Sequence, residues 1–359
     1  MKRRTYLASA SAGVATLAGC SVPLSSGTDR TEWTFEADGS VGSPPLVHDE
    51  VVYVGSHDHY LYALDRHQGV EQWRFPAGQK VIGGVATDGN TLYWGSFDWQ
   101  VYAVDRPQVP DGTPRARWLF ETDSAISSTP VLDGETLYIG SQDRSLYAVS
   151  KSNGSQYWRF ETGSNILAAP AVAEGRLYVG SNDNRLYALE RGSGDKQWHF
   201  ETDGPVGCTP AVVEDTVYAG SYDGHLYAVS ADSGELEWTF QTAGNVQSSP
   251  SVVDGTVYVG DREGVVSALD AETGDDVWQY ETDGTVANSA PVIDDGVLYV
   301  GTGRRAGIHA LDVENGERLW FYETDGTVHD SLALVDELLY FGTMRSGSTP
   351  GKVHAISVV

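Results

Sequence analysis

Eight tryptophans recur along the chain at an almost constant spacing. They stand at Trp33, Trp73, Trp118, Trp158, Trp198, Trp238, Trp278 and Trp320, and successive intervals are 40, 45, 40, 40, 40, 40 and 42 residues. A period of this length is typical of repeat architectures, in which each repeat is one supersecondary unit. The chain is therefore expected to consist of stacked copies of one unit.

Each copy contains four short segments with the composition of β-strands. In residues 248–282, the small-residue stretch SSPSVVDG precedes the apolar runs TVYVG and VVSALD and the tryptophan segment VWQYET. The two middle runs are apolar almost throughout, which indicates strands that are buried on both faces. Turn signals about every 8 to 12 residues, such as Asp223-Gly224, favour hairpins over helices.

The first and last segments of the repeat array complete each other. Trp33 has no unit before it, and the final unit ends at KVHAISVV without a tryptophan strand. If the strand TEWTFEA pairs with the last strand near residues 352–358, every blade has four strands. The sequence thus predicts an all-β fold over residues 31–359, an eight-bladed propeller of four-stranded antiparallel blades whose ring is closed by this pairing.

The repeated positions are expected to be structural. An active site is needed once, whereas a packing contact is needed in every unit. A tryptophan can bury about 150 to 250 Å² of surface, so all eight are predicted to stack one blade on the next.

Residues 1–20, MKRRTYLASASAGVATLAGC, are predicted to be a targeting segment. Their weakly apolar run is shorter than the roughly 20 residues that span a bilayer. The segment ends in a lipobox-like LAGC, so Cys20 is expected to carry a lipid, and the pair Arg3 and Arg4 favours Tat export over Sec export. Residues 21–30 are read as a linker. The protein is therefore expected to be exported and anchored by lipid to the outer face of the cytoplasmic membrane; a chance cysteine is the alternative.

The charge of the chain excludes several partners. The net charge is −27, with 50 acidic against 23 basic residues. At molar salt the Debye length is about 3 Å, so self-repulsion nearly disappears; a halophilic archaeon is the expected source. The same charge repels nucleic acid and anionic lipid, which leaves the lipid as the only membrane contact. Once Cys20 is lipidated, Cys208 has no disulfide partner, and it is expected to be a small buried residue.

The segments ALDAETGDDVW (268–278) and ALDVENGERLW (310–320) resemble the tryptophan-docking repeat of quinoprotein dehydrogenase-like, PQQ-type propellers. The resemblance covers nearly all of residues 31–359 and includes two branches. The enzymes hold pyrroloquinoline quinone (PQQ) over Ca²⁺, against a ring formed by two adjacent cysteines. The other branch is non-enzymatic and includes the BamB-type lipoprotein of the outer-membrane assembly machine.

The chain resembles the non-enzymatic branch more closely in its length, its lipobox and the regularity of its repeats, and it has no adjacent cysteines. The resemblance implies a monomeric scaffold for an unidentified protein partner at the cell surface. No cofactor, metal or catalytic residue is expected. Since an archaeon has no outer membrane, we expect this chain to share the scaffold role of that branch but not to belong to the outer-membrane assembly machine. A PQQ- and Ca²⁺-dependent oxidoreductase and a propeller that binds a small ligand or carbohydrate remain the alternatives.

Departures from the repeat indicate where function resides. Two residues after the leading Val or Ile of each inner strand stand Ser43, Gly83, Ser128, Ala168, Cys208, Ser248, Asn288 and Asp330. The last two, with Gln247 and His329, form a polar sector that is the candidate site for a cation or cofactor. The alternative is that these side chains only hydrate the channel.

Loops with reversed charge are candidate partner contacts. Segments 106–117, 301–307 and 342–351 carry Arg115, Arg117, Arg304, Arg305 and Arg345. Phe97 and Trp99, in a tight turn of the second blade, are expected to be exposed and to add a binding hot spot. The alternative is that these are tolerated surface insertions.

Membrane attachment is expected to depend on Cys20 alone. Cys20→Ser removes the acylated sulfur, and the protein should then appear in the medium instead of the membrane fraction. Fractionation and immunoblotting of cells that express either form provide the measurement. A Cys20→Ser protein that still sediments with membranes would contradict the lipoprotein interpretation.

Overall fold

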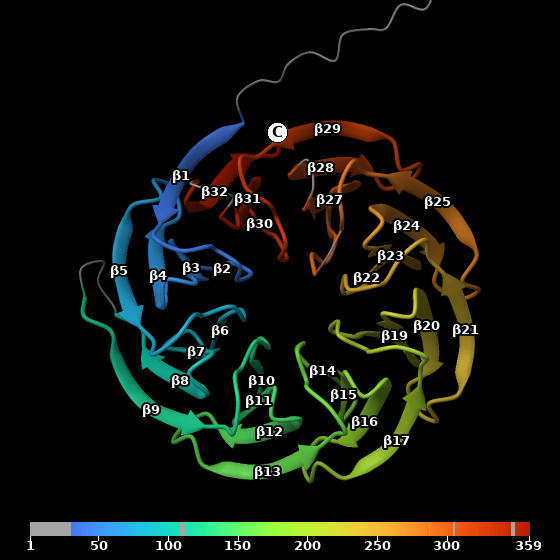
Figure 1. The fold of residues 1–359 in the computed structure, drawn as a ribbon, viewed down its shortest axis with the longest axis horizontal. Coiled ribbons are helices and arrows are strands. Elements are labelled where there is room, and N and C mark those ends of the chain that lie inside the picture. Colours follow the sequence, from blue (N-terminus) through green and yellow to red (C-terminus); the bar gives the residue numbers. More distant parts are fainter. Residues whose placement is uncertain (1–29, 108–111, 287, 304–305, 346–348) are drawn as a thin grey trace, which may run out of the picture.

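The computed structural model describes residues 30–107, 112–286, 288–303, 306–345 and 349–359. Within these residues 32 strands form eight four-stranded antiparallel sheets arranged as blades around a central opening (Figure 1). This confirms the predicted eight-bladed, all-β propeller.

The first four blades follow the chain in order, with the first strand of each blade nearest the axis and the last outermost (Figure 1). Blade 1 contains β2 (Leu46–His48), β3 (Val51–Gly55), β4 (Tyr60–Asp65) and β5 (Glu71–Pro76); blade 2 contains β6 (Ala86–Thr87), β7 (Thr91–Gly95), β8 (Gln100–Asp105) and β9 (Arg115–Glu121). Blade 3 contains β10 (Val131–Asp133), β11 (Thr136–Gly140), β12 (Ser145–Ser150) and β13 (Gln156–Glu161); blade 4 contains β14 (Ala171–Ala173), β15 (Arg176–Ser181), β16 (Arg185–Glu190) and β17 (Lys196–Glu201).

The remaining blades repeat this order, except that blade 8 takes its outer strand from the start of the propeller. Blade 5 contains β18 (Ala211–Val213), β19 (Thr216–Gly220), β20 (His225–Ser230) and β21 (Leu236–Gln241); blade 6 contains β22 (Ser251–Val253), β23 (Thr256–Gly260), β24 (Val265–Asp270) and β25 (Asp276–Glu281). Blade 7 contains β26 (Val292–Asp294), β27 (Val297–Thr302), β28 (Gly307–Asp312) and β29 (Arg318–Glu323); blade 8 contains β30 (Ala333–Val335), β31 (Leu338–Gly342), β32 (Gly351–Ser357) and β1 (Thr31–Ala37).

The tryptophans fasten each blade to the next. Trp198 of blade 4 donates its indole N–H to the carbonyl of Ala231 in blade 5, at 3.1 Å. Its ring lies against Gly234, where φ is +72° and a β-carbon would be 2.6 Å from Trp198 Cδ2. Glycine is needed there both for the positive φ and for the approach of the ring.

The same tryptophan contact recurs at five other junctions. The pairs are Trp33 with Gly69, Trp118 with Gly154, Trp158 with Gly194, Trp238 with Gly274, and Trp278 with Gly316. Trp73 is buried against blade 2, and Trp320 packs with Tyr299 and beneath the guanidinium of Arg30. All eight tryptophans therefore have structural positions at blade junctions, as the repeat predicts.

The ring is closed by the predicted pairing of the two ends of the propeller. β1 is antiparallel to β32, with Trp33 opposite Ala355 (Figure 1). Across the same seam, Arg66 of blade 1 forms an ion pair with Asp336 of blade 8. Tyr340 donates its hydroxyl to the Arg66 carbonyl at 3.3 Å.

Residues 1–29, with Cys20 and the predicted leader, lie outside the described residues. In the part of the chain that is described, no segment forms an apolar helix of bilayer-spanning length.

Deletion of residues 29–38 is expected to destabilise the whole ring. It removes β1 and the Trp33 contact, and loss of one buried tryptophan side chain alone costs about 3 to 5 kcal/mol. Thermal melting in molar KCl measures the loss, with Glu32→Gln, an exposed change on the same strand, as the control. If the deletion melts together with the parent and the control, strand β1 does not close the ring.

Candidate functional site

The channel wall is built by the loops that join one blade to the next. In each loop a Val or Ile packs over a glycine at or next to the end of the second strand of the preceding blade; a β-carbon on Gly55 would lie 2.5 Å from Val81 Cγ1. The contact recurs as Gly95–Ile126, Gly140–Ile166, Gly180–Val206, Gly220–Val246, Gly260–Val286, Gly301–Val328 and Gly342–Val41. Since this contact positions the loop, the residues that follow the Val or Ile are directed to the channel.

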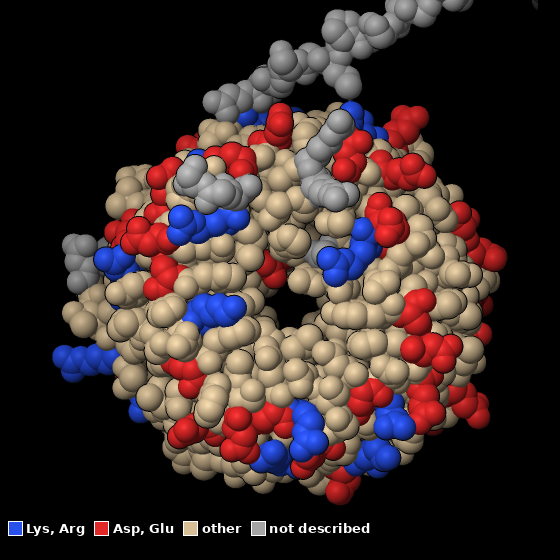
Figure 2. Space-filling view, viewed as in Figure 1, with Lys and Arg blue, Asp and Glu red and all other residues tan. Residues whose placement is uncertain are grey.

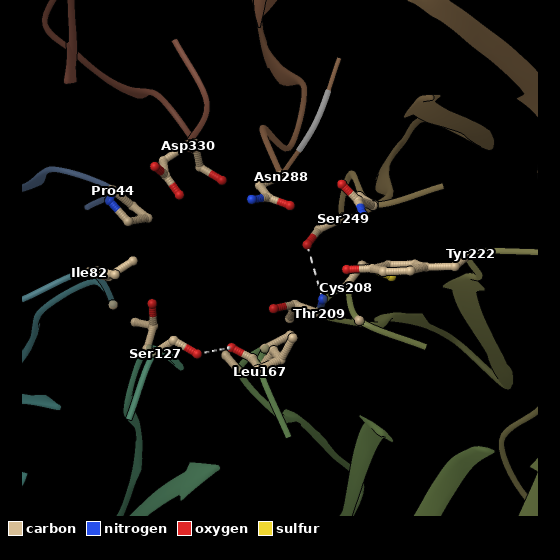
Figure 3. Close-up of a pocket in the computed structure, with 17 residues that line it drawn as sticks. Pro44, Ile82, Ser127, Leu167, Cys208, Thr209, Tyr222, Ser249, Asn288 and Asp330 are labelled. Carbon is tan, nitrogen blue, oxygen red and sulfur yellow. Dashed lines mark hydrogen bonds between the residues drawn. The ribbon is translucent and has the colours of Figure 1, made fainter. Parts of the chain in front are cut away.

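These loops enclose a space of about 260 Å³ on the propeller axis. Its lining combines small and polar residues with a few apolar side chains: Pro44, Ile82, Gly83, Ser127, Thr129, Leu167, Ala168, Ala169, Gly207, Cys208, Thr209, Tyr222, Gln247, Ser249, Asn288, Asp330 and Ser331. Figure 3 shows Asp330 and Asn288 beside each other, across the channel from Ser127 and Leu167. Asp330 carries the one carboxyl group among these described lining residues.

Three of the four residues of the predicted polar sector line this space, namely Gln247, Asn288 and Asp330. The fourth, His329, stands next to the channel residues and lies close to Gly303, where a β-carbon would be 3.4 Å from its Cε1. Burial, with a smaller effect from the charge of Arg262, lowers the pKa of His329 and favours its neutral form.

Asn288 reaches the channel for a reason that the sequence alignment misses. The loop into blade 7 holds one extra residue, so Ser289, not Asn288, is equivalent to Ser248. Ser289 Oγ accepts the N–H of Gly301 at 3.5 Å, as Ser128 Oγ accepts that of Gly140 at 3.0 Å. Asn288 is the inserted residue and has φ of +55°, a conformation that asparagine tolerates better than most residues.

Asp330 occupies the position of these serines but has no hydrogen-bond partner among the described residues. Burial raises the pKa of Asp330 to about 7, because desolvation disfavours the charged carboxylate. The acid therefore exchanges a proton close to neutral pH, unlike the repeated serines that it replaces.

Cys208 is a structural substitute for serine. It is fully buried, and its sulfur accepts the N–H of Gly220 at 3.3 Å. Burial raises the pKa of its thiol to about 11, so the thiol stays protonated and unreactive at neutral pH.

The sequence reasoning overlooked a second polar ring. In blades 1 to 5 a tyrosine of the third strand donates its hydroxyl to the turn aspartate four residues earlier. The pairs are Tyr62–Asp58, Tyr102–Asp98, Tyr147–Asp143, Tyr187–Asp183 and Tyr227–Asp223, at 2.6 to 3.0 Å. The signal was present, since all five sequences read D-x-x-x-Y.

Blades 6 to 8 lack this tyrosine. Ser267, His309 and His354 hold the equivalent pairing positions. Both histidines are buried, and desolvation lowers the pKa of each to about 4. The polar channel residues Gln247, Asn288 and Asp330 belong to loops that enter the same three blades, so departures from the repeat concentrate in this sector.

The predicted partner-contact residues have different environments. Trp99 is 48% exposed, as expected, whereas Phe97 is half-buried and lies beneath the ammonium of Lys80 at 4.4 Å, so the expectation that it is exposed was wrong. Arg115 and Arg117 are exposed on β9, and Arg117 pairs with Asp105 at 2.7 Å.

Arg345 is exposed but held in place, because it donates to the carbonyl of Asp38 at 3.2 Å. Arg304 and Arg305 lie outside the described residues. Figure 2 shows acidic side chains mostly toward the outer part of one face, whereas some lysine and arginine side chains stand nearer the opening of the channel.

This architecture and channel define a propeller of PQQ repeats. The family model that matches is described as outer membrane protein assembly factor BamB, with matches over residues 5–107, 98–238 and 202–357. Because these matches extend over nearly the whole chain, the chain belongs to this family of PQQ-repeat β-propellers. Among curated proteins, none matches.

Several solved structures share the fold. BamB from Moraxella catarrhalis is 19% identical with a TM-score of 0.77, and the match covers 92% of this chain and all of that one. The computationally designed protein Ika8 is 16% identical, with a TM-score of 0.78 and the same coverage. Quinohemoprotein alcohol dehydrogenase ADHIIG from Pseudomonas putida HK5 is 14% identical, with a TM-score of 0.76, over 91% of this chain and 76% of that one. At these identities the similarity shows the fold alone.

Asp330→Asn is expected to stabilise the protein at alkaline pH. The pKa of Asp330 is raised in the folded state, so folding takes up a proton between about pH 4 and 7, and stability is lost as the pH rises through that window. At pH 8 the variant should gain on the order of 1 kcal/mol; at pH 4, where the acid is protonated, the gain should vanish. Urea unfolding with EDTA present, at both pH values, tests this; an equal effect at both would contradict it.

Proposed function

We propose that this chain is a lipid-anchored propeller at the outer face of the cytoplasmic membrane, where it acts as a protein-binding or assembly scaffold. Membership of the BamB-described family supports a scaffold role. Export and anchoring rest on the leader sequence and Cys20. We propose that the face that contacts the partner includes the turn that carries Trp99. The exposed side chain of Trp99 is the main observation in favour of a protein contact there.

Trp99 combines an unusual backbone conformation with an exposed aromatic side chain. Its φ is +72°, a conformation in which a bulky residue is strained. The equivalent turn position also has positive φ in blades 1, 3, 4, 5 and 6, where it holds His59, Arg144, Asn184, Gly224 and Gly264, so Trp99 is distinguished by its large apolar side chain. Trp99 is 48% exposed, so its side chain is available to contact another molecule.

A binding partner would account for this residue. Tryptophan is enriched among the residues that dominate binding energy at interfaces. Lys80 and the half-buried Phe97 of the same blade, with exposed His59 in the corresponding turn of blade 1, offer cationic and aromatic groups nearby. A partner that presents acidic and apolar side chains would complement such a surface.

The quinoprotein alternative has less support from the channel. Ca²⁺ takes six to eight oxygen ligands, and Asp330 is the single carboxylate among the described lining residues. That lining contains no lysine or arginine to meet the carboxylates of the quinone. The chain also has only Cys20 and Cys208, so the paired-cysteine ring is missing from the sequence. These residues do not fit PQQ with Ca²⁺.

Trp99→Asn tests the proposed contact. Asparagine occupies the equivalent position of blade 4 as Asn184, with φ of +67°, so the variant should fold with equal or slightly higher stability. Crosslinked pulldown from membranes in molar salt, quantified by mass spectrometry, should lose at least one protein that the parent retains. The control is Tyr157→Thr, which removes an aromatic side chain that is 55% exposed on the outer strand of blade 3.

We expect at least one protein to be recovered with the parent and with Tyr157→Thr but not with Trp99→Asn. Equal recovery of every protein by both variants and the parent would refute the contact assignment. Recovery that falls equally with both changes would indicate general stickiness of exposed aromatics rather than a defined surface.

A further inference from the structure

Three donor atoms of different chemistry converge at the seam between blades 8 and 1. A β-carbon on Gly42, in the loop before blade 1, would lie 2.8 Å from Met344 Sδ, 3.3 Å from His57 Nε2 and 3.5 Å from Asp330 Oδ2. Met344 and Asp330 belong to blade 8, and His57 belongs to blade 1. A thioether, an imidazole and a carboxylate thus surround one point, at a residue without a side chain.

Comparison with the other loops shows that this convergence is specific to one seam. Among the described residues, the position of Gly42 is held in other loops by Ile82, Ser127, Leu167, Gln247 and His329, all of which have side chains. The other glycine is Gly207, and there a tyrosine occupies the region, with Tyr222 Oη 2.8 Å from the β-carbon position. Only at Gly42, within the described residues, do nitrogen, oxygen and sulfur donors meet in this way.

Two of the three donors lack a protein partner among the described residues. His57 Nε2 is buried and accepts or donates no hydrogen bond. The neutral form of an imidazole ring offers a nitrogen lone pair to a metal. The Asp330 carboxylate is likewise unpaired. An unpaired buried polar atom such as His57 Nε2 is costly; Asp330 is half-buried at the channel wall, and one bound cation would contact both.

Met344 adds a soft ligand. The whole sequence has two methionines, Met1 and Met344. Met344 is half-buried, and its backbone N–H donates to the Thr327 carbonyl at 2.9 Å, which fixes the residue. His57 has the equivalent bond to the Ser40 carbonyl, also at 2.9 Å. The two residues therefore hold the same repeat position in neighbouring blades and border the same point.

We propose that this seam binds one copper ion, held as Cu(I) by Met344 Sδ and His57 Nε2 with Asp330 Oδ2 as a third, charge-neutralising donor. Thioether ligands select Cu(I), and imidazole also suits copper. Calcium prefers oxygen ligands alone, and zinc sites use imidazole, carboxylate or thiolate but not thioether. No group of three His, Cys, Asp or Glu side chains is placed for a metal in the described chain, so the thioether is essential to the site. Asp330 lines the channel, which provides the entry route.

Copper binding is tested on the purified full-length protein under anaerobic conditions. Cu(I), generated with ascorbate, is titrated in competition with bicinchoninate. Potassium sulfate replaces chloride, because chloride itself binds Cu(I). We expect one Cu(I) per chain and a copper–sulfur scattering path in the X-ray absorption spectrum. Met344→Leu and His57→Gln should each lower the affinity by about tenfold or more, and Met344→Leu should also remove the sulfur path.

The control is His67→Gln, an exposed histidine of blade 1 in the turn after β4, which should leave the affinity unchanged. Leucine nearly conserves the volume of methionine, so Met344→Leu is expected to melt at the same temperature as the parent when copper is absent. If the variant is less stable, the presence or absence of a copper–sulfur path in the X-ray absorption spectrum of the parent tests the methionine ligand instead. Binding that is unchanged by Met344→Leu and His57→Gln, or a parent spectrum without a copper–sulfur path, would show an adventitious ion only and overturn the proposal. Failure of this test leaves the partner-contact proposal at Trp99 unaffected, because the two sites share no residue.

Discussion

The docking of a tryptophan from one blade onto a glycine turn of the next is the interaction on which the ring depends. At six junctions the indole ring would lie within 2.4 to 2.7 Å of a β-carbon at the glycine, and that glycine has positive φ. The indole N–H of each of these six also donates to a backbone carbonyl of the following blade, so the contact combines apolar burial with a directional bond. Because a closed ring has a junction after every blade, the contact must recur, which explains the nearly constant spacing of about 40 residues.

A second repeated contact separates structure from function along the channel. The Val or Ile of each inner loop packs over a glycine of the preceding blade and anchors the loop. Residues that follow it can then change without disturbing the core. Serine at this place satisfies a glycine N–H in blade 3, and Cys208 does the same in blade 5. Asp330 keeps the position but loses the bond, so its chemistry is available for something other than folding.

Desolvation shifts the pKa values of the buried acid and of the buried histidines in blades 7 and 8 in opposite directions. It raises the pKa of Asp330 to about 7 and lowers the pKa of His309 and His354 to about 4. In each case burial favours the neutral form. A chain with a net charge of −27 therefore keeps its internal ionisable groups in this sector near neutrality, while its charge lies on the surface. Blades 6 to 8 and their seam with blade 1 hold most departures from the repeat, and Trp99 provides a separate departure in blade 2.

Most of the fold could be predicted from the sequence. The tryptophan period, the apolar middle strands and the phase of the first and last segments determined eight blades, four strands each and closure through residues 31–37. These features depend on the pattern of apolar strand residues and on the turn residues between them, both of which can be recognised in short stretches of sequence. The polar sector was also predicted in part, because Gln247, Asn288 and Asp330 break a local pattern.

The tertiary structure decided what depends on register and on distance in space. An inserted residue in the loop into blade 7 gave Ser289 the role assigned to Asn288, and only the bond from Gly301 reveals that shift. The indole of Trp99 is exposed while Phe97 is half-buried under Lys80, although both occupy the same turn. His57, Asp330 and Met344 are far apart along the chain and meet because ring closure places blade 1 beside blade 8. The sequence determined the four-stranded blade and the number of blades, because both depend on interactions between residues that are near neighbours in the chain. The closed ring decided which side chains share a site, because residues that meet across the seam between blades 8 and 1 are far apart in the sequence.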